Sequence, residues 1–143
     1  MSMDPPKVLL EASFLRAVAD ADDTHHDACT TLYADLVAQY ERQEILLVAV
    51  GDHLRAADLG ADLTNAQRAG WFLHRPRKGV FAPVDPLYVG FQHRRAAAAT
   101  ADVPDPAVAM TLVMCSRHKV RRLATVDPAY DAYDLERLPP TTA

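Results

Sequence analysis

The stretch KVLLEASFL, residues 7–15, decides the fold class of this chain. Its apolar run ends at the acid Glu11, and apolar residues then return at helical spacing from Phe14. A short apolar run followed at once by a helical pattern is typical of a buried strand that leads into a helix. We therefore predict a strand over 7–10, ended by Glu11, and a short helix from Phe14.

The same alternation continues along the chain. The run 45–50 is fully apolar and predicts a central parallel strand, and 123–126 predicts another. The runs 80–84 and 135–138 predict edge strands, the first because it contains a proline. Further helices are predicted to open at Thr24 (an N-cap with Asp27 in a capping box), Asp52, Thr64, Asp85-Pro86 and Asp105-Pro106. This order predicts an α/β fold, a single domain over 1–143 with its core at about 7–138, in which helices flank a central, mostly parallel sheet.

The composition limits the classes of protein to which the chain can belong. A content of 50% hydrophobic residues excludes intrinsic disorder. The longest apolar runs are far shorter than the roughly 20 residues of a membrane span, and the acidic, proline-bearing start predicts no signal peptide. Cys29 and Cys115 are too few for a disulfide framework, so we expect reduced core thiols and a cytoplasmic protein. The net charge of −4 argues against a generally cationic nucleic-acid binder but permits a local basic face.

Four acids stand where predicted strands end or predicted helices begin: Glu11, Asp52, Asp105 and Asp127. In an open parallel sheet, ligands bind outside the carboxyl ends of the strands. Three of the acids follow strands and should lie at that edge, and Asp105 joins them if its helix begins there. Several carboxylates in one place repel each other unless a cation neutralises them. An oxygen-only cluster suits Mg²⁺ or Mn²⁺, and the chemistry implied is metal-assisted phosphodiester hydrolysis by an activated water.

Each acid also has an ordinary structural role available. Asp105 and Asp127 each precede a proline, which is the pattern of an N-cap followed by proline at the first helical position. Asp52 suits the first turn of a helix, where the helix dipole favours negative charge. Glu11 is as good a turn residue as a ligand. The metal-site hypothesis therefore rests on the four acids together.

The motifs around these acids occur in a fixed order along nearly the whole chain. They are VLLEASFL at 8–15, ADADDTHHDA at 19–28, GDHL at 51–54, DPAVA at 105–109 and RRLATVD at 121–127, with an aromatic residue at Tyr130. In this order they resemble the PIN-domain nucleases, and within that family the VapC-type toxins of bacterial toxin–antitoxin pairs. The helix-opening Asp and the later Thr-x-Asp after a strand are the most specific elements.

This resemblance implies a metal-dependent endoribonuclease. It makes the four acids the catalytic and metal-binding residues for Mg²⁺ or Mn²⁺: Glu11, Asp52, Asp105 and Asp127. Ser13 and Thr125 become hydroxyls that orient carboxylates or water. The implied substrate is RNA, cut to leave a 5′-phosphate and a 3′-hydroxyl, with no nucleophilic side chain. The implied partners are a small antitoxin protein and, as is usual in the family, a second copy of the chain.

Two of the acids depart from the family pattern, because the family has Asp first and Glu second where this chain has Glu11 and Asp52. One methylene moves a carboxylate by about 1 to 1.5 Å, whereas Mg²⁺ tolerates little error around bonds of about 2.0–2.1 Å. The two exchanges either compensate in an active enzyme or mark a catalytically impaired PIN-like module that binds RNA or an antitoxin without turnover. A hydrolase of a small phosphorylated substrate is a third alternative.

Other patterns are weaker. Three residues have helical spacing for zinc but lack a second pair of ligands: His25, His26 and Cys29. The remaining histidines are scattered and are predicted to lie on the surface. Basic clusters at 75–78, 93–95 and 117–122 are typical of solvated helix ends, although bound RNA would need phosphate contacts from some of them.

Overall fold

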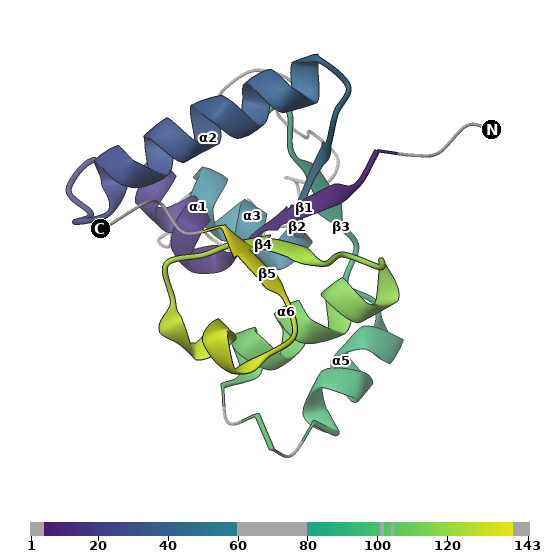
Figure 1. Cartoon of the computed structure of the whole chain (residues 1–143). Coiled ribbons are helices and arrows are strands. Elements are labelled where there is room, and N and C mark those ends of the chain that lie inside the picture. Colours follow the sequence, from purple (N-terminus) through teal and green to yellow (C-terminus); the bar gives the residue numbers. More distant parts are fainter. Residues whose placement is uncertain (1–4, 60–79, 101, 104, 139–143) are drawn as a thin grey trace.

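The computed structural model describes residues 5–59, 80–100, 102–103 and 105–138. Within these residues, five parallel strands form one sheet in the order β3-β2-β1-β4-β5. The strands are β1 (Lys7–Leu10), β2 (Leu46–Val50), β3 (Asp85–Leu87), β4 (Arg122–Ala124) and β5 (Glu136–Leu138). The predicted α/β class with a central parallel sheet is confirmed, and β1 lies in the middle of the sheet (Figure 1).

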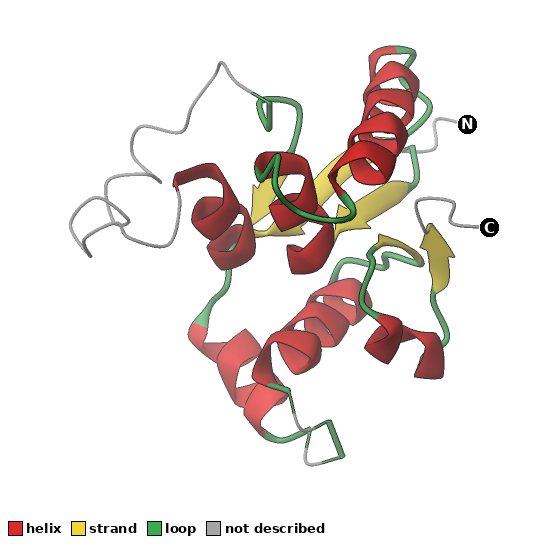
Figure 2. Ribbon diagram, turned by 90° about the vertical axis from the view of Figure 1, so that its left-hand side faces the viewer, coloured by secondary structure: helices red, strands yellow, loops and turns green. Residues whose placement is uncertain are grey.

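Helices cover both faces of the sheet. On one face lie α1 (Ala12–Ala19), α2 (His26–Glu41) and α3 (Gly51–Leu59), and on the other lie α5 (Phe91–Ala98) and α6 (Pro106–Arg117) (Figure 2). A short 3₁₀ helix, η1 (Pro128–Ala132), connects β4 to β5. Of these helices, α1 packs against α2 and α3, and α5 packs against α6.

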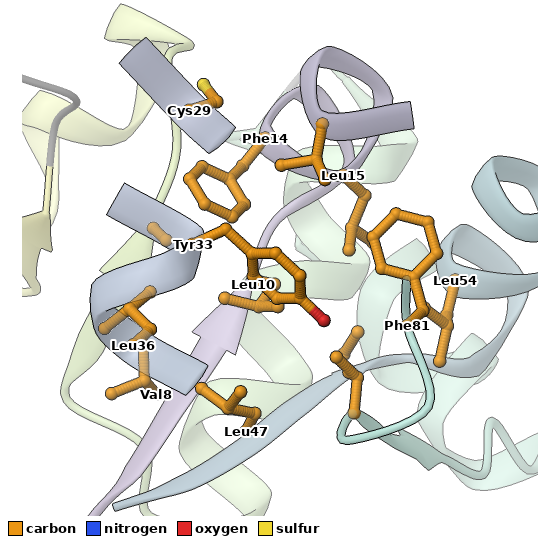
Figure 3. Packing of buried hydrophobic residues seen from close by; sticks show 14 of the residues in the cluster. Val8, Leu10, Phe14, Leu15, Cys29, Tyr33, Leu36, Leu47, Leu54 and Phe81 are labelled. Atoms are coloured by element: carbon orange, nitrogen blue, oxygen red, sulfur yellow. The ribbon is translucent and has the colours of Figure 1, made fainter. Parts of the chain in front are cut away.

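The core consists of two apolar layers, because successive residues of a strand point to opposite faces. Val8 and Leu10 belong to the layer beneath α1 and α2, whereas Leu9 belongs to the layer beneath α6. Figure 3 shows the first layer, in which the rings of Phe14 and Tyr33 meet edge to face with centroids 6.4 Å apart. Burial on both faces explains why the strands are near-continuous apolar runs.

Parallel strands place all their carboxyl ends at the same edge. Glu11 directly follows β1, Asp52 is the second residue after β2, and Asp127 is the third residue after β4. The backbone N–H of Glu11 donates to the carbonyl of Ala124 at 2.9 Å, so the exits of β1 and β4 are in direct contact. The topology therefore gathers three of the predicted acids.

The prediction for residues 80–88 is wrong in its details. The run 80–84 forms turns, and the strand lies at Asp85–Leu87, where a helix start was predicted. Pro86 fits this position because β3 is the edge of the sheet, where a missing N–H costs no ladder bond. The following helix, α5, begins at Phe91 and has Gly90 as its N-cap.

The predicted Thr24 cap of α2 is also wrong. This helix begins at His26, and its N-cap residue, His25, makes no side-chain cap bond. Asp23 closes the preceding turn instead, because its carboxylate accepts from the His25 N–H at 2.8 Å and its carbonyl accepts from the His26 N–H at 3.0 Å. The chain therefore turns through two further residues before the helix begins.

The predicted helix from Thr64 and the basic loop at 75–78 lie outside the described residues. The extent of the domain, 1–143, stays a prediction. Among the helices that the structure describes, none is long and apolar enough to cross a membrane.

Candidate active site

Glu11 is the most deeply buried of the four acids. It is only 4% exposed, at the point where β1 passes into α1. Its carboxylate is the N-cap of α1, because Oε1 accepts from the Ser13 N–H at 3.0 Å. A burial this deep is costly for a carboxylate unless donors surround it.

Three donors converge on the same oxygen of Glu11. Besides the Ser13 N–H, Oε1 accepts from the Ser13 hydroxyl and from the Thr125 hydroxyl, the latter at 2.6 Å. Thr125 is fully buried and belongs to the segment after β4. Both hydroxyls that were predicted to orient carboxylates therefore contact Glu11. Its second oxygen, Oε2, accepts no hydrogen bond from the described residues.

The same two hydroxyls tie Glu11 to the segment that carries Asp127. Thr125 Oγ1 accepts from the Asp127 N–H at 3.0 Å, and Ser13 Oγ accepts from the Val126 N–H at 3.2 Å. These bonds fix the backbone of Asp127 relative to the buried carboxylate. The network therefore orients two of the candidate acids at once.

Asp105 and Asp127 are both N-caps, as their Asp-Pro sequences predict. Asp105 Oδ1 accepts from the Ala107 N–H at 2.8 Å at the start of α6. Asp127 Oδ1 accepts from the Ala129 N–H at 2.9 Å at the start of η1. In each carboxylate Oδ2 accepts no hydrogen bond from the part of the chain that the structure describes. Capping thus fixes one oxygen and leaves the other available.

The buried phenol of Tyr130 lies within electrostatic range of three of the acids. Its side chain is 2% exposed, and its hydroxyl lies near that of Thr111 but makes no well-formed hydrogen bond with a described residue. Burial is the largest cause that raises the pKa of Tyr130 above its usual range, and three negative charges raise it further: Glu11, Asp127 and Asp105. The Thr111 hydroxyl opposes this change in the pKa. All three acids therefore lie within electrostatic range of this phenol.

The pKa of His53 shows that the fourth acid, Asp52, also acts on a side chain in this region. Burial lowers the pKa of His53, and three negative charges oppose that change: Glu11, Asp52 and Asp105. Its Nδ1 atom is buried and has no hydrogen-bond partner among the described residues. The predicted surface position is therefore wrong for this edge of the ring, which lies where α3 packs on α1. All four acids thus lie within electrostatic range of one or both of two side chains, Tyr130 and His53.

Asp52 differs from the other acids because it forms two ion pairs. Its Oδ1 accepts from Arg55 Nη2 at 3.2 Å, and its Oδ2 accepts from Arg94 Nη2 at 3.0 Å. Arg55 is one turn along α3, whereas Arg94 comes from α5 on the other face of the sheet. Positive charge therefore reaches both oxygens of this carboxylate.

The chain matches no protein-family model and no curated protein sequence. Its fold, however, is found in solved structures. VapC20 from Mycobacterium tuberculosis, a toxin that cleaves the sarcin–ricin loop, has a TM-score of 0.58 at 13% identity, over 87% of this chain and 93% of that chain. FitAcB from Neisseria gonorrhoeae has a TM-score of 0.53 at 15% identity, over 93% of this chain and 97% of that chain.

The chain has a PIN-like fold. The resemblance to VapC-type proteins that the motifs predicted is confirmed for the fold. At 13–15% identity, the structural similarity shows the fold alone, so the roles of individual residues have to be argued from this chain itself.

In this PIN-like fold, three of the acids follow strands at the carboxyl edge and Asp105 precedes α6, and the four do not form a closed cage. No group of three or more His, Cys, Asp or Glu side chains within the described ranges is arranged to hold a metal ion. The three residues weighed as zinc ligands, His25, His26 and Cys29, have other roles. Cys29 is buried in the core, where burial raises the pKa of its thiol to about 11. His26 Nδ1 instead contacts the carbonyl of Ala17 at 2.7 Å.

Sequence reasoning missed two side chains of the site, His53 and Arg55, and it placed Arg94 only in the basic cluster 93–95 without its contact to Asp52. His53 belongs to the GDHL motif at 51–54, and the only signal for its role was its position directly after Asp52 at the start of a helix. Arg55 is three residues from Asp52, which is the spacing of neighbours on a helix surface. Arg94 is 42 residues from Asp52, and no local pattern indicated that contact.

Proposed function

We propose that this chain is a Mg²⁺- or Mn²⁺-dependent endoribonuclease of the VapC toxin type. The observation that supports this most is the hydrogen-bond network in which Ser13 and Thr125 join the buried Glu11 carboxylate to the backbone of Val126 and Asp127, at the carboxyl edge of a PIN-like sheet. VapC20, whose fold is similar, is a toxin that cleaves the sarcin–ricin loop. Together, the site chemistry and the fold support hydrolysis of RNA phosphodiester bonds.

The donor set fits a hard divalent cation. Carboxylate oxygens are the ligands that Mg²⁺ and Mn²⁺ prefer, and three of the acids keep one oxygen that accepts no hydrogen bond from the described residues. Mg²⁺ usually keeps several waters and takes only one or two protein carboxylates directly. An open arrangement of acids therefore suits this ion better than a closed cage would.

The residues of this chain would prepare the site before any cation or RNA arrives. Ser13 and Thr125 hold Glu11 by one oxygen, which directs the other oxygen for binding. Asp105 and Asp127 are fixed by the helices that they cap. When bound, the cation supplies an activated water and stabilises charge on the attacking and leaving oxygens. No side chain is required as a nucleophile.

The proposed ligand set also includes Asp52, and this acid is the reason for a second candidate function. Arg55 and Arg94 already neutralise its carboxylate, which reduces the negative charge left to attract a cation. A PIN-like module that binds RNA or an antitoxin without turnover would have such a site. The exchanged acids at positions 11 and 52 point in the same direction.

The proposal extends to the surroundings of the protein. We propose one cytoplasmic domain over 1–143, whose partners are an RNA substrate, a small antitoxin protein and a second copy of the chain. These partners follow from the VapC toxin type, and a coexpressed antitoxin that copurifies with the chain would support them.

The test is cleavage of a structured RNA pool by the purified chain in Mg²⁺, in Mn²⁺ and in EDTA. Asp105→Asn is the decisive variant, because Asn caps a helix as well as Asp does but carries no charge. Asp35→Asn is the matched control, since Asp35 is exposed on α2 and lies outside the site. We expect metal-dependent cutting by the wild-type chain and by Asp35→Asn, and none by Asp105→Asn.

Three results would contradict the proposed metal-dependent nuclease. Cutting in EDTA, or equal cutting by Asp105→Asn, would show that the acids are not the catalytic groups. No cutting by a folded wild-type chain in either metal would favour the binding module. In that case, the double variant Glu11→Asp and Asp52→Glu would test whether the exchanged acids are the cause.

A further inference from the structure

We propose that an RNA base stacks on an aromatic corner formed by Tyr88 and Phe91, next to the candidate active site. The inference rests on the proposed function and narrows its substrate to RNA that presents an unpaired base beside the bond to be cut. The aromatic corner lies between β3 and α5, with Tyr88 in the connection and Phe91 as the first residue of the helix.

The two rings are unusually exposed for their type. Tyr88 is 75% exposed and Phe91 is 74% exposed, the highest values among the large apolar side chains that the structure describes. Tyr88 and Phe91 are three residues apart in the sequence, and leaving two aromatic rings in water at such a short separation along the chain forfeits the stabilisation that burial gives, which indicates a binding surface. Stacking on such rings is how proteins hold unpaired bases.

The rings also sit on an ordered support. A Cβ atom added at Gly90 would lie 3.3 Å from Tyr88 Cε1, so the Tyr88 ring packs directly over this glycine. The Gly90 N–H donates to His93 Nδ1 at 2.9 Å, which fixes the start of α5. A base would therefore meet a surface that needs little further ordering, which favours binding.

Positive charge accompanies the rings. The guanidinium of Arg95 lies 5.8 Å from the centroid of the Phe91 ring, at the i,i+4 position of the same helix. The sequence of α5, FQHRRAAA, contains two arginines and no acid, in a chain of net charge −4. Rings beside guanidinium groups suit a strand of RNA, because bases stack on the rings and phosphates pair with the arginines.

Arg94 connects the aromatic corner to the candidate active site. It follows Phe91 by three residues, which places both on neighbouring parts of the helix surface, and its Nη2 atom contacts Asp52 at 3.0 Å. One turn of helix rises only about 5.4 Å, so an RNA strand that lies across Phe91 and Arg94 would run toward Asp52. Arg94 is 57% exposed and uses one of its five N–H donors on Asp52, which leaves others for a phosphate.

A second copy of the chain fits this surface less well. In a symmetric dimer through this surface, the arginines of α5 would face their own copies, and the helix carries no acid to pair with them, so like charges would repel. The same composition is favourable for RNA, since the negative phosphates compensate the arginines. RNA is therefore the occupant that the chemistry of the aromatic corner favours.

The experiment measures binding separately from cleavage. A 12-nucleotide, uridine-rich unpaired RNA with one central 2-aminopurine is titrated with the full chain in EDTA, and quenching of its fluorescence reports stacking. The variants are Phe91→Ala, Tyr88→Ala and Phe91→Trp, with Tyr40→Ala as the control because Tyr40 is 36% exposed on α2. Thermal unfolding confirms that each variant folds.

We expect quenching by the wild-type chain and a loss of affinity of about fivefold or more for each alanine variant at the aromatic corner, since stacking is worth at least about 1 kcal/mol per base. Phe91→Trp should restore both quenching and affinity, and Tyr40→Ala should change neither. Absence of binding or quenching by the wild-type chain would overturn the proposal. Unchanged RNA affinity of Phe91→Ala would also overturn it. This includes the case in which sedimentation shows a dimer for the wild-type chain and a monomer for Phe91→Ala, because the aromatic corner would then be a contact between two copies of the chain.

The outcome is separable from that of the proposed function. If the chain quenches 2-aminopurine through Phe91 but cuts no RNA in Mn²⁺, the nuclease fails and the stacking surface stands. If the chain cuts RNA in a metal-dependent way and Phe91→Ala binds and quenches like wild type, the stacking surface fails and the nuclease stands.

Discussion

Replacing Thr125 by valine removes one hydroxyl from the centre of the acid network and nearly preserves the shape of the side chain. This hydroxyl is fully buried, donates to Glu11 Oε1 at 2.6 Å and accepts from the Asp127 N–H at 3.0 Å. Both bonds are lost in Thr125→Val. The variant therefore measures how strongly the network holds the two acids in place.

The expected loss of stability follows from these two bonds. A hydrogen bond to a charged acceptor is worth about 1.5–3 kcal/mol, and a partly buried N–H left without a partner adds about 1 kcal/mol. Ser13 still donates twice to Glu11, so the carboxylate does not lose all its donors. We expect the free energy of unfolding to fall by about 2–4 kcal/mol. For a chain of this length that lowers Tm by roughly 6–15 °C.

The assay is urea unfolding together with differential scanning calorimetry, and Thr111→Val is the matched control. Thr111 is also fully buried and its hydroxyl also lies near the Tyr130 hydroxyl, but the well-formed hydrogen bond that it donates is to the Ala107 carbonyl of its own helix, at 3.0 Å. That carbonyl lies inside a regular helix, so the control should lose less than about 1 kcal/mol. Equal effects of the two substitutions would refute the reasoning, because the Thr125 hydroxyl would then have no special value.

Three other predictions concern the caps, the thiols and a histidine. Asp105→Asn and Asp127→Asn should each change the free energy of unfolding by less than about 0.5 kcal/mol in urea titrations, whereas Asp105→Ala should cost about 1 kcal/mol; a large loss for the Asn variants would contradict simple capping. Burial raises the thiol pKa of Cys29 to about 11 and that of Cys115 to about 12. A disulfide reagent at pH 8 should therefore label both at least about 100-fold faster in guanidinium than in the native chain, and equal rates would count against this burial. Because burial lowers the pKa of His53, the unfolded chain binds more protons than the folded chain just below pH 6.5. Unfolding free energy should fall as the pH drops below about 6.5, and His53→Gln should flatten that decline; an unchanged pH profile for the variant would argue against it.

Much of the fold could be predicted because the strands are short apolar runs bounded by polar residues. The runs at 7–10 and 45–50 correspond to β1 and β2 within one residue, and Asp105 begins α6 as its Asp-Pro sequence predicts. These features are local, since burial on both faces and helix capping are written in neighbouring residues. The amino-acid sequence alone therefore indicates which acids follow strands and which begin helices.

The errors arose where tertiary contacts override local preference. Asp85-Pro86 has the sequence of a helix start, but pairing with β2 makes it an edge strand. Arg94 reaches Asp52 across 42 residues, and only the packing of α5 brings them together. The burial of the Nδ1 edge of His53 likewise depends on how α3 packs against α1. Contacts of this kind have no period or spacing in the sequence.

The most direct test of the central claim is a calorimetric titration of the metal-free chain with Mn²⁺, compared between wild type, Asp105→Asn and Asp35→Asn. Because the acids at the carboxyl edge are proposed to hold the cation, wild type and Asp35→Asn should bind Mn²⁺ with equal affinity, and Asp105→Asn should bind it at least about tenfold more weakly. Saturable binding that is identical in all three proteins, or no binding by the wild-type chain, would contradict the claim that these acids form a metal-dependent active site.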